Sequence, residues 1–298
     1  AITKLIDFYL IELFSNFNLL LQTCLLSALT MISSLRVAQN HARIKTTLTL
    51  VVCMCSIIMF PLLVFAEVPQ EEISGLHSLY LSTEGYEWMW RDPSLAWDFT
   101  QNASGAYTAN PCHVVGEDSP WEGLHCESEV ASGSCEDEAC HVIGIEFYYF
   151  DLFGEVPSEL SKLSRLQTLE ISGNGLSGEI PESIGDLTEL ELLEFSYNEL
   201  TSTIPDSFSK LVKLTYLSLW ENYMTGHIPV DIGELSSLIK FDIETNVFSG
   251  PLPSSIGKMK LLEVMQMEDN HISGSIPAEI GNASSLVVCR LDENMVTG

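Results

Sequence analysis

Residues 163–186 read LSRLQTLEISGNGLSGEIPESIGD, and residues 187–210 repeat the pattern as LTELELLEFSYNELTSTIPDSFSK. The pattern is L-x-x-L-x-x-L-x-L-x-x-N-x-L-x-G-x-I-P, and it recurs every 24 residues from Ala139 to the end of the chain. Its Asn and Pro positions are Asn174, Asn198, Asn222, Asn246, Asn270 and Asn294, and Pro157, Pro181, Pro205, Pro229, Pro253 and Pro277. A strict repeat of this length predicts a solenoid.

Each repeat reads as a strand, a turn and a return segment. Leu169 and Ile171 alternate with polar residues at the period of a strand, so successive strands should stack into one parallel sheet over a shared core. The recurring Asn follows the strand, where its carboxamide can both donate to and accept from backbone of its own and adjacent coils. The following Pro cannot donate within a central strand, which predicts a turn or a short edge strand.

These residues resemble the plant-type leucine-rich repeat, found in ectodomains of receptor kinases, in receptor-like proteins and in cell-wall inhibitor proteins. The resemblance covers about residues 76–298 and implies an α/β solenoid: a right-handed superhelix with a parallel concave sheet, preceded by a disulfide-bonded helical cap. Repeats begin at Ala139, Leu163, Leu187, Leu211, Leu235, Met259 and Ala283. The seventh stops in mid-pattern, so we expect a truncated end, after which more repeats, an anchor or a kinase domain could follow.

The segment before the repeats resembles the amino-terminal cap of that family, which reads P-C and then W-x-G-V-x-C. The matching stretches are Asn110-Pro111-Cys112 and Trp121-Glu122-Gly123-Leu124-His125-Cys126. The resemblance implies that Cys112 pairs with Cys126, which leaves Cys135 to pair with Cys140, although four thiols allow three connectivities. We expect the helical part of the cap to be built by Trp88, Trp90 and Trp97, after Ile73, Leu76 and Leu79.

A zinc site is the competing interpretation of the cap cysteines. They stand among His113, His125 and His141, which offers seven possible ligands within thirty residues. The spacing matches no compact zinc finger, and an exported segment oxidises its thiols, so we predict no metal and no cofactor. Cys289 occupies the register of Leu169 and is predicted to be a buried, inert thiol.

An apolar run from Thr46 to Ala66 is about as long as a bilayer is thick, and it follows three basic residues. It predicts a transmembrane helix or signal anchor at 46–66, a cytosolic or membrane-associated region at 1–45, and an extracellular remainder. Val64-Phe65-Ala66 also fits a cleavage site, so a secreted protein is the alternative. Residues 5–35 form a second apolar stretch whose status the sequence leaves open.

The extracellular part is predicted to hold the cap at 67–138 and the solenoid, six repeats and a truncated seventh, at 139–298. Export allows disulfides and allows glycosylation at Asn102 and Asn282, which head N-x-S sequons. The chain is therefore predicted to be a single-pass plasma-membrane glycoprotein.

Net charge restricts the partners of this extracellular part. Residues 67–298 hold nine Lys and Arg against 39 Asp and Glu, a formal charge of −30. Such a field repels nucleic acid and attracts cationic peptides or divalent ions. Adaptation to salty surroundings, without any partner, is the alternative.

Outward positions of the stacked strands form the candidate ligand surface on the concave face. Aromatic residues cluster in the early repeats and acidic residues in the late ones, which favours a peptide or protein ligand with basic residues. The predicted contacts are Tyr148, Tyr149, Glu170, Glu194, Tyr197, Tyr216, Trp220, Asp242 and Glu244. Packing of the aromatic residues on each other and binding of a glycan are the alternatives.

Catalysis is not predicted for this chain. The phosphate-loop match at 173–178 belongs to the repeat pattern, and the adjacent carboxylates Glu170 and Glu194 lie on an open sheet without a dry pocket. The sequence therefore predicts the extracellular recognition module of a membrane-tethered receptor-like or adhesion protein. A secreted inhibitor or a structural cell-surface glycoprotein is the alternative.

Overall fold

The computed structural model describes residues 68–112, 120–128 and 140–297, all within the second of two compact units, residues 65–298. The predicted span at 46–66 and the second apolar stretch at 5–35 lie outside the described residues. Within the described ranges, no helix is both long enough and apolar enough to cross a bilayer.

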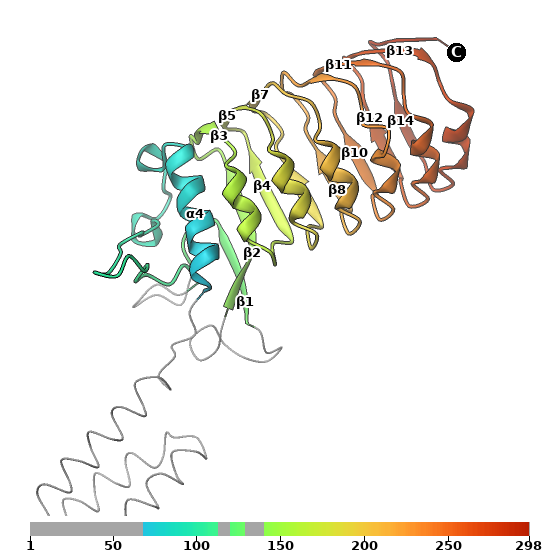
Figure 1. Cartoon of the computed structure of the whole chain (residues 1–298). Helices are drawn as coiled ribbons and strands as arrows, with labels where there is room; N and C mark the ends of the chain where they lie inside the picture. Colours follow the sequence, from blue (N-terminus) through green and yellow to red (C-terminus); the bar gives the residue numbers. More distant parts are fainter. Residues whose placement is uncertain (1–67, 113–119, 129–139, 298) are drawn as a thin grey trace, which may run out of the picture. The chain divides into compact units, whose positions relative to one another are not determined.

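Within the described residues, the main sheet has eight strands, and seven of them come from successive repeats. Figure 1 shows strands of successive repeats lying side by side. Its first strand, β1 (Leu124–Ser128), belongs to the predicted cap and pairs antiparallel with β2; all later pairs are parallel. The order continues with β2 (Cys140–Tyr148), β4 (Thr168–Ser172), β6 (Leu192–Glu194), β8 (Tyr216–Ser218), β10 (Lys240–Asp242), β12 (Val264–Gln266) and β14 (Val288–Arg290). Leu169 lies opposite Ile145 and Leu193, so each step of the sheet advances 24 residues.

The return segments form two smaller parallel sheets, as the predicted short edge strands would. One contains β3 (Phe153–Glu155), β5 (Gly175–Gly178) and β7 (Glu199–Leu200). The other contains β9 (Thr225–Gly226), β11 (Val247–Gly250), β13 (His271–Ser275) and β15 (Met295–Thr297).

Short 3-10 helices complete the coils on the side away from the main sheet (Figure 1). They are η3 (Ser158–Lys162), η4 (Glu182–Asp186), η5 (Asp206–Lys210), η6 (Ile232–Glu234), η7 (Ser254–Lys258) and η8 (Ala278–Asn282). Between the two layers lies one apolar core, in which Leu169, Leu193 and Leu217 have no exposed surface. The leucine-rich-repeat solenoid predicted from the pattern is therefore the fold of residues 140–297.

The predicted hydrogen bonding of the repeated Asn is confirmed, as Asn198 illustrates. Its Oδ1 accepts from Leu176 N at 3.0 Å in the preceding coil. Its Nδ2 donates to Ile171 O at 2.7 Å and to Phe195 O at 3.0 Å, so one buried side chain joins two coils. Asn174, Asn222, Asn246, Asn270 and Asn294 make the same kinds of contact.

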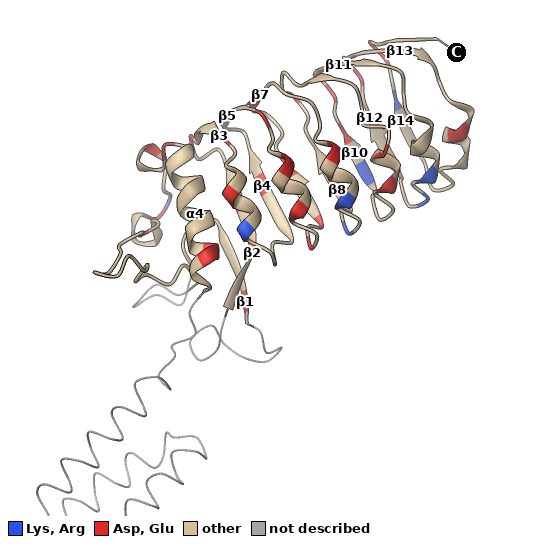
Figure 2. Ribbon diagram, in the orientation of Figure 1, with Lys and Arg blue, Asp and Glu red and all other residues tan. Residues whose placement is uncertain are grey.

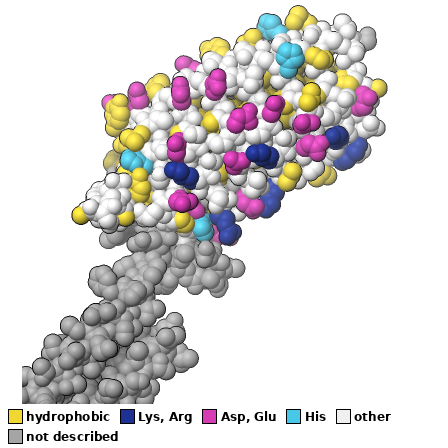
Figure 3. Space-filling model, in the orientation of Figure 1, with side chains coloured by type: hydrophobic (Ala, Val, Ile, Leu, Met, Phe, Trp, Pro, Cys, Tyr) yellow, Lys and Arg dark blue, Asp and Glu magenta, His cyan; other side chains and the backbone are white. Residues whose placement is uncertain are grey.

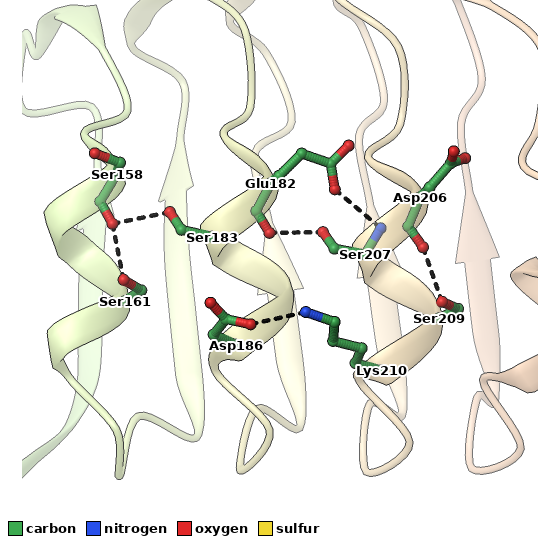
Figure 4. Close-up of polar contacts among 9 residues, drawn as sticks. All are labelled: Ser158, Ser161, Glu182, Ser183, Asp186, Asp206, Ser207, Ser209 and Lys210. Carbon is green, nitrogen blue, oxygen red and sulfur yellow. Dashed lines mark hydrogen bonds and ion pairs between the residues drawn. The ribbon is translucent and has the colours of Figure 1, made fainter.

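The 3-10 helices are also tied together across coils by polar groups (Figure 4). Ser183 Oγ donates to Ser158 O at 2.8 Å, and Ser207 Oγ donates to Glu182 O at 2.7 Å. Lys210 pairs with Asp186 one coil earlier at 2.9 Å. On the face drawn in Figure 3, acidic and basic side chains are interspersed, so charge here is partly balanced within the chain.

The cap covers the first coil with an α-helix and a cluster of aromatic rings. Helix α4 (Gln70–Ser82) buries Ile73, Leu76 and Leu79, as predicted. The tryptophans, however, are not helical as predicted, because Trp88, Trp90 and Trp97 follow α4 in a segment with only two short 3-10 turns, η1 (Gly85–Glu87) and η2 (Pro93–Leu95). There Trp88 Nε1 donates to Thr83 O at 2.8 Å and Trp97 Nε1 to Glu122 O at 3.0 Å.

The cap disulfide implied by the family resemblance is present in the structure. Cys112 and Cys126 are bonded, with 5.8 Å between their Cα atoms. Cys140 is also disulfide-bonded, while its predicted partner Cys135 lies outside the described residues.

The prediction that Cys289 is buried is wrong. Cys289 does lie in register with Met265 on β12, but its thiol is free and the residue is exposed. The reason is that no later coil among the described residues packs against β14, whereas Met265 is covered on both sides.

Candidate functional site

The outward positions of the main sheet form a face whose two halves differ in chemistry. Over β2 to β8 it carries aromatic rings, small Ser residues and the carboxylates Glu146, Glu170 and Glu194. Over β10 to β14 it carries acidic residues together with Lys240 and Arg290, whose strands show blue segments in Figure 2. Of the predicted contacts, seven lie in the first half, with Tyr216 next to the second half, and Asp242 and Glu244 lie in the second half.

Four aromatic residues of the first half form the aromatic patch: Tyr148, Tyr149, Tyr197 and Trp220. Tyr148 and Tyr149 meet edge to face with ring centroids 4.3 Å apart, and Tyr197 meets Trp220 in the same way at 4.4 Å. Tyr148 and Tyr149 are 50% and 54% exposed, so this mutual packing leaves half of each residue open to solvent. The predicted packing of these aromatic residues on one another is therefore observed, and their contact with a ligand stays a prediction.

Backbone geometry sets where two of these rings stand. Tyr149 and Tyr197 directly precede the repeated Asn position, where the chain is left-handed with φ of 55° at both residues. Gly173 holds the same position between them with φ of 67°. A Cβ at Gly173 would lie only 2.4 Å from Tyr149 Cε1, so the glycine is what lets the Tyr149 ring lie against the turn.

Glu170 and Glu194 lie side by side on β4 and β6 in the sheet register. Partial burial raises the pKa of Glu170, and the nearby carboxylate of Glu146 raises it further. Partial burial and the charge of Glu170 raise the pKa of Glu194, while Lys240 opposes this shift. Each raised pKa reflects a carboxylate whose charge is poorly compensated.

Lys240 makes a compact cation cluster with Tyr216 and Asp242. Its Nζ lies 3.1 Å from Asp242 Oδ2, 3.1 Å from the Tyr216 hydroxyl and 4.9 Å from the centre of the Tyr216 ring. Burial raises the pKa of Asp242, and the pairing with Lys240 counteracts that shift. Asp242 is only 3% exposed, so it is not open to a ligand as predicted, and we leave it out of the proposed contact surface.

Acidic residues of the last coils are likewise engaged within the chain. Arg290 Nη1 lies 3.1 Å from Glu268 Oε1, and Gln266 Nε2 donates to Glu244 Oε2 at 3.4 Å. Partial burial and the neighbouring Glu268 raise the pKa of Glu244. Glu244 thus stays on the face but lies beyond the aromatic patch.

The sequence prediction missed Lys240 as a determinant of this face. Lys240 stands in the outward row of Thr168, Leu192 and Tyr216, one residue before each central core position. Comparing that row with the row of Glu146, Glu170, Glu194 and Asp242 would have placed a cation beside Asp242.

The two predicted glycosylation sites both lie on the surface. Asn102 is exposed in a turn, where its Oδ1 accepts from Ser104 N at 2.9 Å. Asn282 is exposed at the end of η8. Glycosylation of these residues stays a prediction.

Comparisons with known proteins agree with this architecture. Residues 164–224 match the leucine rich repeat family model. A search of curated proteins found no match. These comparisons support the plant-type leucine-rich-repeat interpretation that the motifs indicated.

Among solved structures, the chain is similar to ectodomains of receptors. It is 30% identical to PEPR1 in a structure with AtPEP1, with a TM-score of 0.62 over 76% of this chain and 28% of that chain. It is 30% identical to the Arabidopsis receptor kinase HAESA in complex with the peptide hormone IDA and the co-receptor SERK1, with a TM-score of 0.50 over 52% and 26%. Pollen Receptor Kinase 3 is 25% identical, with a TM-score of 0.54 over 67% and 91%. The chain spans less than a third of the PEPR1 and HAESA chains.

Proposed function

We propose that this chain is the extracellular recognition module of a membrane-tethered receptor-like or adhesion protein. It binds a peptide or protein ligand on the outer face of the main sheet and performs no catalysis. The observation that carries the proposal is the aromatic patch, in which Tyr148 and Tyr149 are half exposed. It lies beside poorly compensated carboxylates on a sheet held by buried Asn contacts.

Aromatic rings held on a rigid sheet can supply much of the binding energy of such a face. Tyr and Trp bury a large area with few rotatable bonds, and they are enriched where interfaces are energetically most important. The Asn contacts join successive coils, so the rings are presented on a rigid support and little ordering is needed on binding. The similarity to PEPR1 with AtPEP1 and to HAESA with a peptide hormone supports the same class of ligand.

A peptide display screen against the oxidised, glycosylated full chain tests the proposal. Ligands recovered from the screen should bind at least tenfold more weakly to Trp220→Ala and to Tyr148→Ala, which is the effect of removing an interface hot spot. Tyr223→Ala is the matched control, because Tyr223 is 61% exposed but lies outside the main sheet. If the screen recovers no ligand, or if all three variants lose the same affinity, the sheet face is not the binding surface.

Membrane tethering is tested separately by carbonate extraction of cells that express the full chain. A tethered protein resists extraction, and a secreted inhibitor or structural glycoprotein is released into the medium. Glycan arrays in the same binding assay separate sugar recognition from peptide recognition.

A further inference from the structure

The aromatic patch borders two small residues of the same face. Tyr148 and Trp220 stand in one outward row, separated by Ser172 at the end of β4 and by Ser196 two residues after β6. Both Ser residues are almost fully buried, with 2% and 1% exposure, so neighbouring side chains cover them. Ser172 Oγ lies 3.4 Å from Glu170 Oε1, which places the Glu170 carboxylate beside Ser172.

Glu170 and Glu194 stand two residues before these Ser residues on the same side of β4 and β6. Neighbouring strands are about 4.8 Å apart, so one cationic group can reach both carboxylates. Among the ion pairs of the described residues, neither Glu170 nor Glu194 takes part in one. Asp242 and Glu268, in the second half of the face, are paired with Lys240 and Arg290.

The Lys240 cluster shows how this sheet holds a cation. A carboxylate from the same strand and an aromatic ring from the neighbouring strand hold the ammonium together. The first half of the face offers the same two components, a pair of carboxylates and the rings of Tyr148 and Tyr197. Strands β4 to β8 carry no Lys or Arg, and Arg91 of the cap is engaged with Tyr148 O at 2.8 Å and with the ring of Phe150. The charge of the open half is therefore complementary to a cation that arrives with the ligand.

We propose that Glu170 and Glu194 receive the guanidinium group of an arginine in a peptide ligand bound on this face. The proposal rests on the proposed function and names the chemistry of that same surface. Guanidinium suits the position because its planar fork can donate to two carboxylates at once and can also lie against a tyrosine ring, which an ammonium does less well.

Two probes test the arginine position in the full chain. The first is the pair N-acetyl-argininamide and N-acetyl-citrullinamide, which differ in charge but hardly in shape, followed by NMR titration. The second is a peptide from the display screen, compared with its arginine-to-citrulline analogue. The variant is Glu170→Gln/Glu194→Gln, and the charge-matched control is Glu179→Gln/Glu279→Gln, whose exposed residues lie outside the main sheet.

We expect argininamide to perturb Ser172 and Ser196 signals while citrullinamide does not, and we expect citrulline to weaken peptide binding roughly five- to tenfold. Both differences should vanish in the Glu170→Gln/Glu194→Gln variant and persist in the control. Equal binding of the charged and neutral probes, or an equal loss in the control, overturns the arginine position. If the screened peptides still lose affinity with Trp220→Ala, that result leaves the proposed function intact.

Discussion

Lys240 Nζ lies 3.1 Å from Oδ2 of Asp242, and this contact neutralises a carboxylate that is only 3% exposed. The two residues stand two positions apart on β10 and face outward together. The pair closes one part of the sheet face to ligands while the neighbouring part over β4 and β6 stays open.

Loss of Lys240 should destabilise the solenoid. Lys240→Met leaves the buried Asp242 carboxylate unpaired, which should lower the free energy of unfolding by about 2 to 3 kcal/mol at pH 7, since removing one partner of a buried pair is costly. The pairing holds down the pKa of Asp242. Without Lys240 that pKa rises further above the unfolded value near 3.9, so the deficit is present at neutral pH and fades as pH falls and the carboxyl protonates.

Urea denaturation at pH 4 and pH 7 measures this difference, with Lys258→Met as the control. The Lys258–Glu234 pair is well exposed to solvent, so its loss should change the free energy of unfolding much less than the loss of Lys240. Equal costs for the two variants would show that Lys240 is not needed to neutralise Asp242.

The repeated part of this fold could be predicted from sequence because its strand pairing and its Asn contacts recur every 24 residues. Asn198 and Asn222 contact equivalent backbone groups, so the pattern alone identified both their position and their role. The cap has no repeating pattern. The sequence therefore showed that Trp88 is apolar, but it did not show that Trp88 lies outside a helix. Cys289 has the register of a core residue, yet burial also requires a neighbour on the other side of its coil.

Removal of one internal Asn should cost more than removal of an exposed one. Asn222→Ala leaves the buried groups Leu200 N and Phe195 O without their partner, which should lower the free energy of unfolding by about 1 to 3 kcal/mol. Asn282→Ala, at an exposed position, should change it by less than about 0.5 kcal/mol when both proteins are made without glycans. Chemical denaturation measures the free energy of unfolding of both variants. Similar losses of stability would show that the internal Asn contacts do not stabilise the stacking of coils.

A core substitution in β8 should mainly reduce stability, whereas a surface substitution in the turn that follows β8 should mainly reduce ligand binding. Leu217 is fully buried, so Leu217→Ala should cost about 2 to 5 kcal/mol by opening a cavity. Trp220 is half-buried against Tyr197, so Trp220→Ala should cost about 1 kcal/mol and should mainly weaken ligand binding. Calorimetry and a binding assay on the same samples check both, and an equal loss of stability would place Trp220 in the core.

The raised pKa values of Glu170 and Glu194 should make stability fall as pH rises, opposite to a salt-bridged carboxylate. A raised folded-state pKa means that the folded chain keeps protons that the unfolded chain releases. The stabilisation is therefore full below the unfolded pKa near 4.3 and is lost as pH rises through the folded value.

Glu170→Gln/Glu194→Gln should then raise the free energy of unfolding at pH 7 by less than about 1 kcal/mol, because both side chains are partly solvated. The same variant should match the parent protein near pH 3.5. Thermal unfolding at the two pH values measures this, with Glu179→Gln/Glu279→Gln as the control. A stabilisation that is the same at both pH values would mean that the unfavourable charges on β4 and β6 are not its source.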